Sequence, residues 1–353
     1  MEKLIISTQE NLKSEILIED DLRNNIQNYF EDKKYFLITN TKVAKLYPEI
    51  VYKFHDNRVI IIKDGEKYKN IKTFEYILNQ LLKEKIERKD CIVALGGGVV
   101  GDLAGYVASS ILRGVELIQI PTTLLAMCDS SIGGKTGFNS KYGKNLIGSF
   151  YMANKILIDP QFINTLNDYE YKCGLGEILK YAFIEKSCNK YSEIDLINFL
   201  TVNQTQDIRN QMGYIIKSCA TLKASVVAND RLEGGLRKIL NFGHTYAHAI
   251  ETLGKYKKFS HGQAVAHGIK YASKLAVTKN LISNEYFDKI NFLLEKLELT
   301  KKQVKFKKED IINLMKQDKK VENSKINLLL PTAPSVVELF DNIDLPSIEA
   351  SLL

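Results

Sequence analysis

Cysteine is scarce in this sequence, and its distribution excludes two kinds of site. The five cysteines are odd in number, widely scattered and never form a Cys-x-x-Cys pair. A disulfide framework needs cysteines that pair at regular spacings, and a thiolate zinc site needs close pairs of them. Neither is expected here, and a reducing cytoplasm is the expected setting of the protein.

Long apolar runs are missing as well. The first residues lack the apolar core of a signal peptide, and no run reaches the length that spans a bilayer, so we expect no membrane partner. The net charge of +7 comes from 49 basic and 42 acidic residues that are spread along the chain. A nucleic-acid binder more often carries a dense basic stripe, so the charge favours a small anionic substrate over nucleic acid.

The apolar pattern changes in character along the 353 residues, a length that allows about two domains. The first half alternates short apolar runs with helical patterns, which is typical of a parallel sheet flanked by helices. Strands are predicted at residues 35–39, 58–63, 91–95, 117–120 and 155–158, and a helix at 73–82. From about residue 160 the periodicity is mainly helical, with helices predicted at 215–227 and 286–297 and a short strand at 325–330.

A glycine-rich stretch, GGGVVGD at residues 96–102, follows the strand predicted at 91–95 and opens an alanine-rich helix. It matches GxGxxG in the strand–turn–helix context where a diphosphate binds the helix N-terminus. The match is imperfect, because other strands precede it and Glu116, about twenty positions on, starts the next strand instead of ending it. We therefore predict diphosphate binding here and a ribose contact from elsewhere. The loop DGEKYK at 64–69 is the candidate, with a solvated turn as the alternative.

A third loop region is predicted at residues 121–145. Its GGKT fragment at 133–136 is part of a nucleotide triphosphatase loop, but the first glycine of GxxxxGK[ST] is replaced by Asp129. A triphosphatase is excluded on that ground. The lysines of the region still suit an anionic ligand, and a flexible loop with solvated lysines is the alternative.

Four of the five histidines fall within residues 240–268: His244, His248, His261 and His267. Histidine is the commonest metal ligand, and His244 and His248 have the spacing to share a helix face. We interpret the stretch as a helix–loop–helix that delivers nitrogen ligands to a metal, against the alternative of exposed polar histidines. Glu177, in the glycine-flanked segment GEILK, is the predicted carboxylate ligand, although a surface ion pair with Lys180 would also explain it.

Seven motifs in sequence order resemble those of the 3-dehydroquinate synthase family, which belongs to the sugar-phosphate cyclases. They are DGEKYK (64–69), GGGVVGDLAGYVAS (96–109), PTTLLAMCDSSIGGKTG (121–137), GKNLIGSF (143–150), GEILK (176–180), GGLRKILNFGHTYAHAIE (234–251) and HGQAVAHG (261–268). The resemblance implies an α/β N-terminal nucleotide-binding domain with a parallel sheet over residues 1–159. It also implies a mainly α-helical C-terminal metal-binding domain over 160–353, an active site between the two, and a homodimer.

The resemblance also assigns roles to single residues. It implies that Glu177, His244 and His261 hold Zn²⁺ or Co²⁺, and it moves His248 from the metal to the substrate side, while His267 is structural. The implied NAD contacts are Asp64, Gly65, Glu66, Lys67, Tyr68, Lys69, Gly98, Val99, Val100, Gly101, Asp102, Thr122, Thr123, Lys135, Lys144, Phe162, Ile163, Asn164 and Thr165. The implied substrate contacts are Asp129, Lys135, Asn145, Lys180, Lys223, Arg237, Asn241, His248, one of Lys319 or Lys320 and, across a dimer interface, Arg113.

Two positions depart from the family pattern. Gln263 stands where glutamate is common, and Asn40 stands where an acidic ribose contact often occurs. Neither change removes an implied metal ligand, but the second bears on the adenosine side of the NAD site.

The implied substrate is 3-deoxy-D-arabino-heptulosonate 7-phosphate, whose carboxylate and phosphate explain the many lysines and arginines better than a neutral sugar would. The implied reaction is transient oxidation by NAD, loss of phosphate, reduction, ring opening and closure to 3-dehydroquinate. Three alternatives stay open at this point. They are a cyclase acting on glucose 6-phosphate or sedoheptulose 7-phosphate, a metal-dependent polyol dehydrogenase, and a non-catalytic NAD-binding scaffold.

Overall fold

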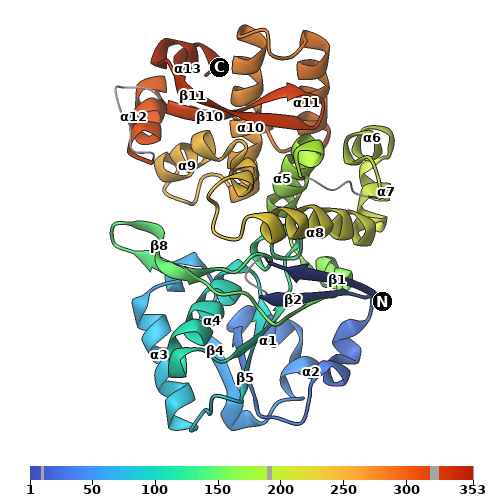
Figure 1. Cartoon of the computed structure of the whole chain (residues 1–353), viewed down its shortest axis with the longest axis vertical. Coiled ribbons are helices and arrows are strands. Elements are labelled where there is room, and N and C mark those ends of the chain that lie inside the picture. Colours follow the sequence, from blue (N-terminus) through green and yellow to red (C-terminus); the bar gives the residue numbers. More distant parts are fainter. Residues whose placement is uncertain (9–11, 189–192, 319–325, 353) are drawn as a thin grey trace. The chain divides into compact units, whose positions relative to one another are not determined.

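Strand β5 (Cys91–Gly96) is buried at every residue, and the N-terminal part of the protein is built around it. The computed structural model describes residues 1–8, 12–188, 193–318 and 326–352. The chain divides into two units, Met1–Leu166 and Asn167–Leu353, which are treated separately below (Figure 1).

In the N-terminal unit, seven of the described strands form one sheet in the order β1-β2-β9-β6-β5-β3-β4. Their bounds are β1 (Glu2–Ser7), β2 (Lys13–Ile18), β3 (Tyr35–Asn40), β4 (Val59–Ile62), β6 (Glu116–Pro121) and β9 (Lys155–Ile158). Every neighbouring pair is parallel except β1 and β2, so the predicted parallel sheet is confirmed. The helices of this unit are α1 (Thr41–Leu46), α2 (Pro48–Val51), α3 (Ile71–Lys83) and α4 (Gly98–Ser110).

The strand order places a topological switch point between β3 and β5. From β3 the chain continues to β4 on one side, and from β5 it continues to β6 on the other. Ligands of open parallel sheets bind outside the carboxyl ends of the strands at such a point. Asn40 ends β3 and Gly97 follows β5, so both lie at the position where a nucleotide is expected.

The region predicted as a loop at residues 121–145 is ordered, and that prediction was wrong. It contains a π-helix, η6 (Ala126–Ser130), and an antiparallel hairpin of β7 (Lys135–Ser140) and β8 (Gly143–Phe150). The strands approach so closely that a Cβ on Gly148 would lie 2.1 Å from Thr136 O. Strand β8 exposes most of its residues, so the apolar alternation that predicts a strand is missing there.

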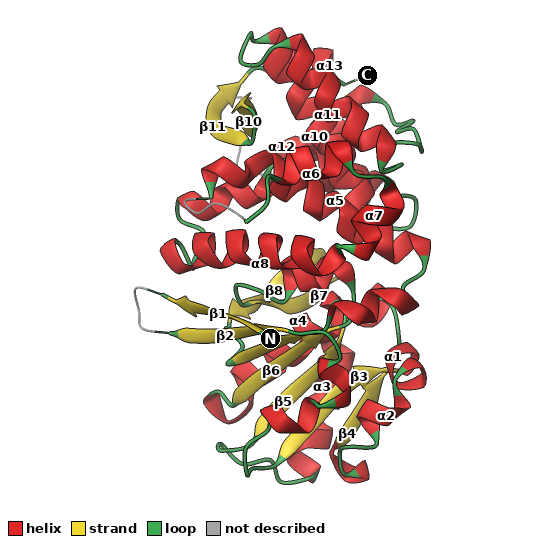
Figure 2. Ribbon diagram, turned by 90° about the vertical axis from the view of Figure 1, so that its right-hand side faces the viewer, coloured by secondary structure: helices red, strands yellow, loops and turns green. Residues whose placement is uncertain are grey.

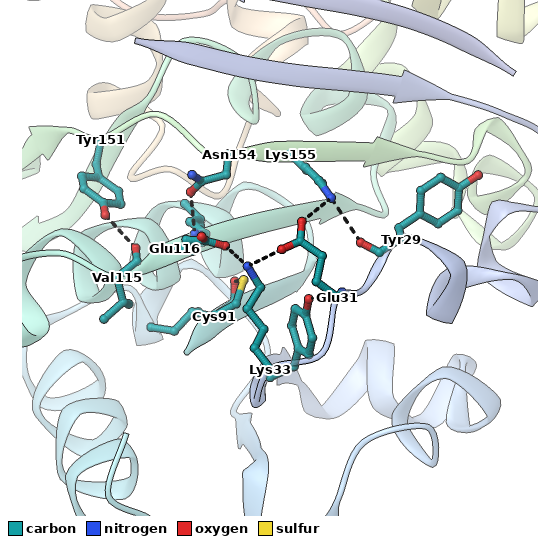
Figure 3. A network of polar contacts seen from close by, with 12 residues as sticks. Tyr29, Glu31, Lys33, Cys91, Val115, Glu116, Tyr151, Asn154 and Lys155 are labelled. Carbon is teal, nitrogen blue, oxygen red and sulfur yellow. Dashed lines mark hydrogen bonds and ion pairs between the residues drawn. The ribbon is translucent and has the colours of Figure 1, made fainter. Parts of the chain in front are cut away.

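A polar network ties together the amino ends of the parallel strands (Figure 3). Lys33 Nζ lies 3.2 Å from Glu31 Oε2 and also pairs with Glu116, the first residue of β6. Lys155, the first residue of β9, lies 3.4 Å from Glu31 Oε1, and Asn154 Oδ1 accepts a hydrogen bond from Leu117 N. The network therefore lies at the amino ends of the strands, and the glycine-rich loop lies at their carboxyl ends. Its ion pairs and hydrogen bonds can stabilise the sheet without touching the predicted nucleotide contacts.

The C-terminal unit is mainly helical, as predicted, and its helices predominate in Figure 2. They are α5 (Asp168–Ile184), α6 (Leu196–Val202), α7 (Thr205–Asn210), α8 (Met212–Asn229), α9 (His244–Leu253), α10 (His261–Thr278), α11 (Asn284–Lys296), α12 (Lys308–Asp318) and α13 (Leu345–Ser351). A hairpin of β10 (Ile326–Ala333) and β11 (Val336–Ile343) accompanies them. Helix α10 packs against α5, α9, α11 and β10, and is thus the core of this unit.

The boundary between the two units follows Leu166, whereas the domain boundary was predicted between residues 159 and 160. The 3-10 helix η7 (Pro160–Thr165) belongs to the N-terminal unit because Tyr47 holds it there. The Tyr47 and Phe162 rings pack edge to face at 4.8 Å, and the Tyr47 hydroxyl bonds to Thr165 Oγ1.

The described part of the chain contains neither a membrane-spanning helix nor a disulfide. Each of its helices is too short or too polar to cross a membrane. The five cysteines all lie there, are buried and form no disulfide.

Candidate active site

Three potential metal ligands meet in the C-terminal unit. Glu177 lies on α5, while His244 and His261 are the first residues of α9 and α10. One carboxylate oxygen and one nitrogen from each imidazole all lie within 4.8 Å of one another. Glu177 Oε1 is 3.6 Å from His244 Nε2 and 3.3 Å from His261 Nε2.

These separations fit a single tetrahedral ion. A zinc ion about 2.1 Å from each ligand would hold the ligands roughly 3.4 Å apart. Two imidazoles and a carboxylate suit zinc and cobalt alike, and three protein ligands leave a position open for a substrate oxygen. The side chain of Glu177 is only 1% exposed, and a bound cation would compensate the burial of its charge.

The two histidines reach this arrangement in different electrostatic settings. Burial lowers the pKa of His244 to about 3, opposed in part by Glu177, so this ring is neutral at neutral pH. Burial also acts to lower the pKa of His261, but the carboxylates of Glu251 and Glu177 outweigh it and raise that pKa well above its ordinary value. A metal binds an unprotonated nitrogen of a neutral imidazole, so metal binding should release a proton from His261.

Backbone geometry brings the ligands to these positions. Gly243, which precedes His244, has a left-handed φ of 79°, and a Cβ on Gly268 of α10 would lie 2.0 Å from Gly243 O. Only glycine permits both the turn into α9 and its close approach to α10. The change at Gln263 is also explained, because its side chain and Ser260 form a capping box at the start of α10, a role that glutamine and glutamate share.

Cationic and polar side chains predicted to contact substrate gather in the same unit. Lys180 pairs with Glu177 Oε2 where both side chains are buried, so the alternative of a surface ion pair is wrong. The His248 ring lies 5.7 Å from the His244 ring, beside the potential metal ligands but not among them. His248 therefore lies outside the cluster that its spacing from His244 predicted it to join, and its role on the substrate side stays a prediction.

Lys223 and Arg237 are also buried, and the elements that carry them pack on α5. Helix η9 (Leu236–Asn241), which holds Arg237 and Asn241, contacts both α5 and α8. Arg237 N donates to Asp230 Oδ2 at 2.8 Å, and Asn241 Nδ2 donates to Glu233 Oε1 at 2.5 Å. Such burial of three cations in one small unit favours an anionic ligand.

In the N-terminal unit the structure brings the three predicted loops together through Lys69. This side chain is buried, and its Nζ lies 2.5 Å from Asp102 Oδ2 and 2.6 Å from Asn145 Oδ1. Lys144 lies 3.9 Å from Glu66, and Asn40 donates to Asp64 Oδ1 at 3.0 Å. Asn40 thus has two roles: its side-chain oxygen caps α1, and its side-chain N–H group holds the DGEKYK loop through Asp64. An ionised acidic residue could cap the helix but could not donate the second hydrogen bond.

The start of α4 has the features of a diphosphate site. Gly97 is the N-cap residue, and a Cβ on Gly98 would lie 3.1 Å from Ser130 Oγ. That hydroxyl is buried and makes no hydrogen bond within the described residues, so a polar ligand here would satisfy it. Free N–H groups and the positive end of the helix dipole point the same way. Thr122, buried at the end of β6, donates its N–H to Gly96 O beside this helix start.

The other predicted NAD and substrate contacts are not part of the clusters described above. The side chains of Phe162 and Ile163 are buried in the N-terminal core, so only Asn164, Thr165 or backbone atoms of that segment could reach a ligand. Arg113 ends the 3-10 helix η5 (Ile111–Arg113) with a left-handed φ of 64°. Lys135 is exposed at the start of β7, and Asp129 lies in the π-helix η6. Lys319 and Lys320 lie outside the described residues.

One residue beside the potential metal ligands was not predicted from the sequence. Glu251 lies on α9, is buried, and its Oε2 is 3.3 Å from His261 Nδ1. Its spacing of seven residues from His244 and three from His248 places all three on one face of the helix. That spacing was the signal that could have found it.

Comparison with known proteins shows which family the chain belongs to. The family model described as 3-dehydroquinate synthase N-terminal matches residues 59–173, and the model described as 3-dehydroquinate synthase C-terminal matches residues 174–321. The chain belongs to the 3-dehydroquinate synthase family. It is 38% identical to the 3-dehydroquinate synthase of Prochlorococcus marinus (strain AS9601), covering 94% of this chain and 93% of that one. It is 39% identical to that of Campylobacter fetus subsp. fetus (strain 82-40), covering 96% and 98%.

Solved structures share the fold of this 3-dehydroquinate synthase family member. A 2-deoxy-scyllo-inosose synthase complexed with carbaglucose-6-phosphate, NAD+ and Co2+ is 23% identical with a TM-score of 0.88, covering 99% of both chains. A 2-epi-5-epi-valiolone synthase from Streptomyces hygroscopicus subsp. jinggangensis 5008 with NAD+ and Zn2+ bound is 22% identical with a TM-score of 0.86, covering 98% of both. The predicted combination of an α/β part with a parallel sheet and a mainly helical C-terminal part is the fold of these two structures.

Proposed function

We propose that the chain catalyses the reaction of its family, the conversion of 3-deoxy-D-arabino-heptulosonate 7-phosphate to 3-dehydroquinate and phosphate, as a phosphorus–oxygen lyase. The observation that carries the proposal is the cluster of Glu177, His244 and His261 in a unit that also buries three cations. This substrate carries a carboxylate and a phosphate, which are the anionic groups that guanidinium and ammonium side chains bind.

Two cofactors are part of the proposal. Glu177, His244 and His261 would hold Zn²⁺ or Co²⁺, and the loops joined by Lys69, with the start of α4, would hold NAD. Related cyclases contain NAD+ with Co2+ or Zn2+, which supports the same classes of cofactor here. When bound, NAD would take up and return a hydride, and the metal would polarise substrate oxygens and lower the basicity of the reacting alkoxide.

The protein's own side chains bind and orient the substrate in this proposal. The planar fork of Arg237 suits the carboxylate, because a guanidinium donates two parallel hydrogen bonds. Asn241, on the same helix η9, can add an amide contact. The point charges of Lys180 and Lys223 suit anionic oxygens, including those of the departing phosphate. His248 is exposed beside the proposed metal ligands, where its ring nitrogens can form a hydrogen bond with a substrate hydroxyl.

The assembly and setting complete the proposal. We expect a homodimer in which Arg113 contacts the phosphate in the partner's site, and action in a reducing cytoplasm, which suits five buried cysteines without a disulfide.

The test is release of inorganic phosphate from the heptulosonate phosphate with NAD⁺ well below the substrate concentration. We expect many turnovers per NAD⁺, no net absorbance from NADH, and loss of activity with a chelator that Zn²⁺ or Co²⁺ restores. Net NADH in proportion to substrate would instead identify a polyol dehydrogenase. Phosphate release from glucose 6-phosphate or sedoheptulose 7-phosphate, but not from the acid, would identify a different cyclase.

A further inference from the structure

Glu251 approaches the potential metal site from behind one of its ligands. Its Oε2 lies 3.3 Å from His261 Nδ1, on the far side of the ring from Nε2, which lies 3.3 Å from Glu177 Oε1. The Glu251 carboxylate therefore faces the ring nitrogen that is not turned to the metal position. It is not itself one of the clustered ligands.

An imidazole that gives Nε2 to a metal carries its proton on Nδ1, and that N–H needs an acceptor. His244 meets this need with a backbone carbonyl, since its Nδ1 lies 3.2 Å from Phe242 O. His261 is the first residue of α10 and has Glu251 in the corresponding place. The two ligands are thus oriented by different groups, one neutral and one charged.

Helix α9 fixes the position of Glu251 relative to the two histidines that it carries. His244, His248 and Glu251 follow one another at intervals of four and three residues on α9, so they share a face. The side chain of Glu251 is buried, with 8% of it exposed, and its contact with His261 Nδ1 offsets part of the cost of burying the carboxylate. Its location on the same helix face as a ligand and a substrate-side histidine links the orientation of His261 to the placement of α9.

We propose that Glu251 is a positioning residue of the metal site: it accepts a hydrogen bond from His261 Nδ1, fixes the tautomer and ring orientation of His261, and thereby raises metal affinity. This rests on the metal site of the proposed function. Glu251→Ala removes the acceptor, Glu251→Gln keeps an uncharged acceptor of the same size, and Glu251→Asp keeps the charge but shortens the side chain.

The experiment measures zinc affinity of the full chain by competition with a chromophoric chelator, and the visible absorption of the Co²⁺-loaded protein. We expect Glu251→Ala to weaken zinc binding by about 10–100-fold and to change the Co²⁺ bands, with Glu251→Gln between it and the wild type. Glu185→Ala is the matched control for Glu251→Ala. Glu185 is a buried carboxylate in the same unit that accepts a hydrogen bond from Leu196 N, so its loss should lower stability and leave zinc affinity unchanged.

Wild-type zinc affinity and an unaltered Co²⁺ spectrum in folded Glu251→Ala or Glu251→Gln would overturn the proposal, even if both variants melt earlier. Absence of zinc binding by the wild type would overturn it as well. Zinc-loaded wild type that releases no phosphate from any of the sugar phosphates would contradict only the proposed reaction, because zinc affinity is read without substrate.

Discussion

Gly176 and Gly262 lie backbone against backbone, and each is next in sequence to a potential metal ligand, Glu177 or His261. A Cβ on Gly176 would lie 2.3 Å from Gly262 O, and a Cβ on Gly262 would lie 2.1 Å from Cys173 O. Helices α5 and α10 therefore touch without side chains between them, and this contact sets the spacing between Glu177 and His261.

The substitution Gly262→Ala should separate these helices. We expect it to lower the free energy of unfolding by about 1–3 kcal/mol or more, because backbone atoms cannot yield to the added methyl group. Bound zinc should fall with it, since the ligands move apart. Gly234→Ala is the control, because its Cβ would meet nothing nearer than Asp230 Oδ1 at 3.9 Å. Chemical denaturation and metal analysis of both variants decide the matter, and unchanged zinc content in Gly262→Ala would contradict it.

Arg237→Lys should be severe although both residues are cations. The buried guanidinium is replaced by one point charge, so the forked contact proposed with the substrate carboxylate would be lost. We expect kcat/KM to fall by about 100-fold or more, corresponding to about 3 kcal/mol. Lys238→Arg, on the exposed side of the same helix, should keep wild-type kinetics. Wild-type turnover by Arg237→Lys would remove Arg237 from the site.

Lys69→Met should weaken NAD binding. It removes the cation that holds Asp102 at the start of α4 and Asn145 on β8. We expect the Kd for NAD to rise by about 10-fold, or about 1.4 kcal/mol, in a fluorescence or calorimetric titration. Lys72→Met, which changes an exposed lysine on α3, should leave it unaltered. Equal affinity in both variants would show that the junction of the three loops does not serve NAD.

His267 should make stability depend on pH. It is buried, with Nε2 2.9 Å from Lys302 O, and burial lowers its pKa to about 4 from about 6.5 in the unfolded chain. The folded state then binds fewer protons between these values, so stability is full above pH 6.5 and declines as pH falls towards 4. His267→Gln should lessen that decline by about 2–4 kcal/mol in metal-free protein. If the free energy of unfolding fell equally with pH in the wild type and the variant, His267 would not be the cause of the decline.

The sequence predicted the parts of this molecule that carry strong periodicity or crowded chemistry. Five strands of the parallel sheet were predicted because buried strands appear in the sequence as continuous apolar runs, whereas β2 was not predicted. The potential metal site was predicted because four histidines fall in one stretch. The hairpin of β7 and β8 was missed because its spacing depends on glycines and its residues are exposed. Glu251 was missed because a single acidic residue on a helix becomes informative only when a second helix brings His261 to it.

The central claim is that Glu177, His244 and His261 hold one divalent ion that turnover requires. Zinc-edge X-ray absorption of the zinc-loaded protein, together with the zinc content of His261→Ala, tests it most directly. We predict one zinc per chain with two imidazole ligands, oxygen in the remaining positions and no sulfur, and a folded His261→Ala that has lost both metal and phosphate release. Sulfur ligation in the wild type, or a fully active and metal-replete His261→Ala, would contradict the account.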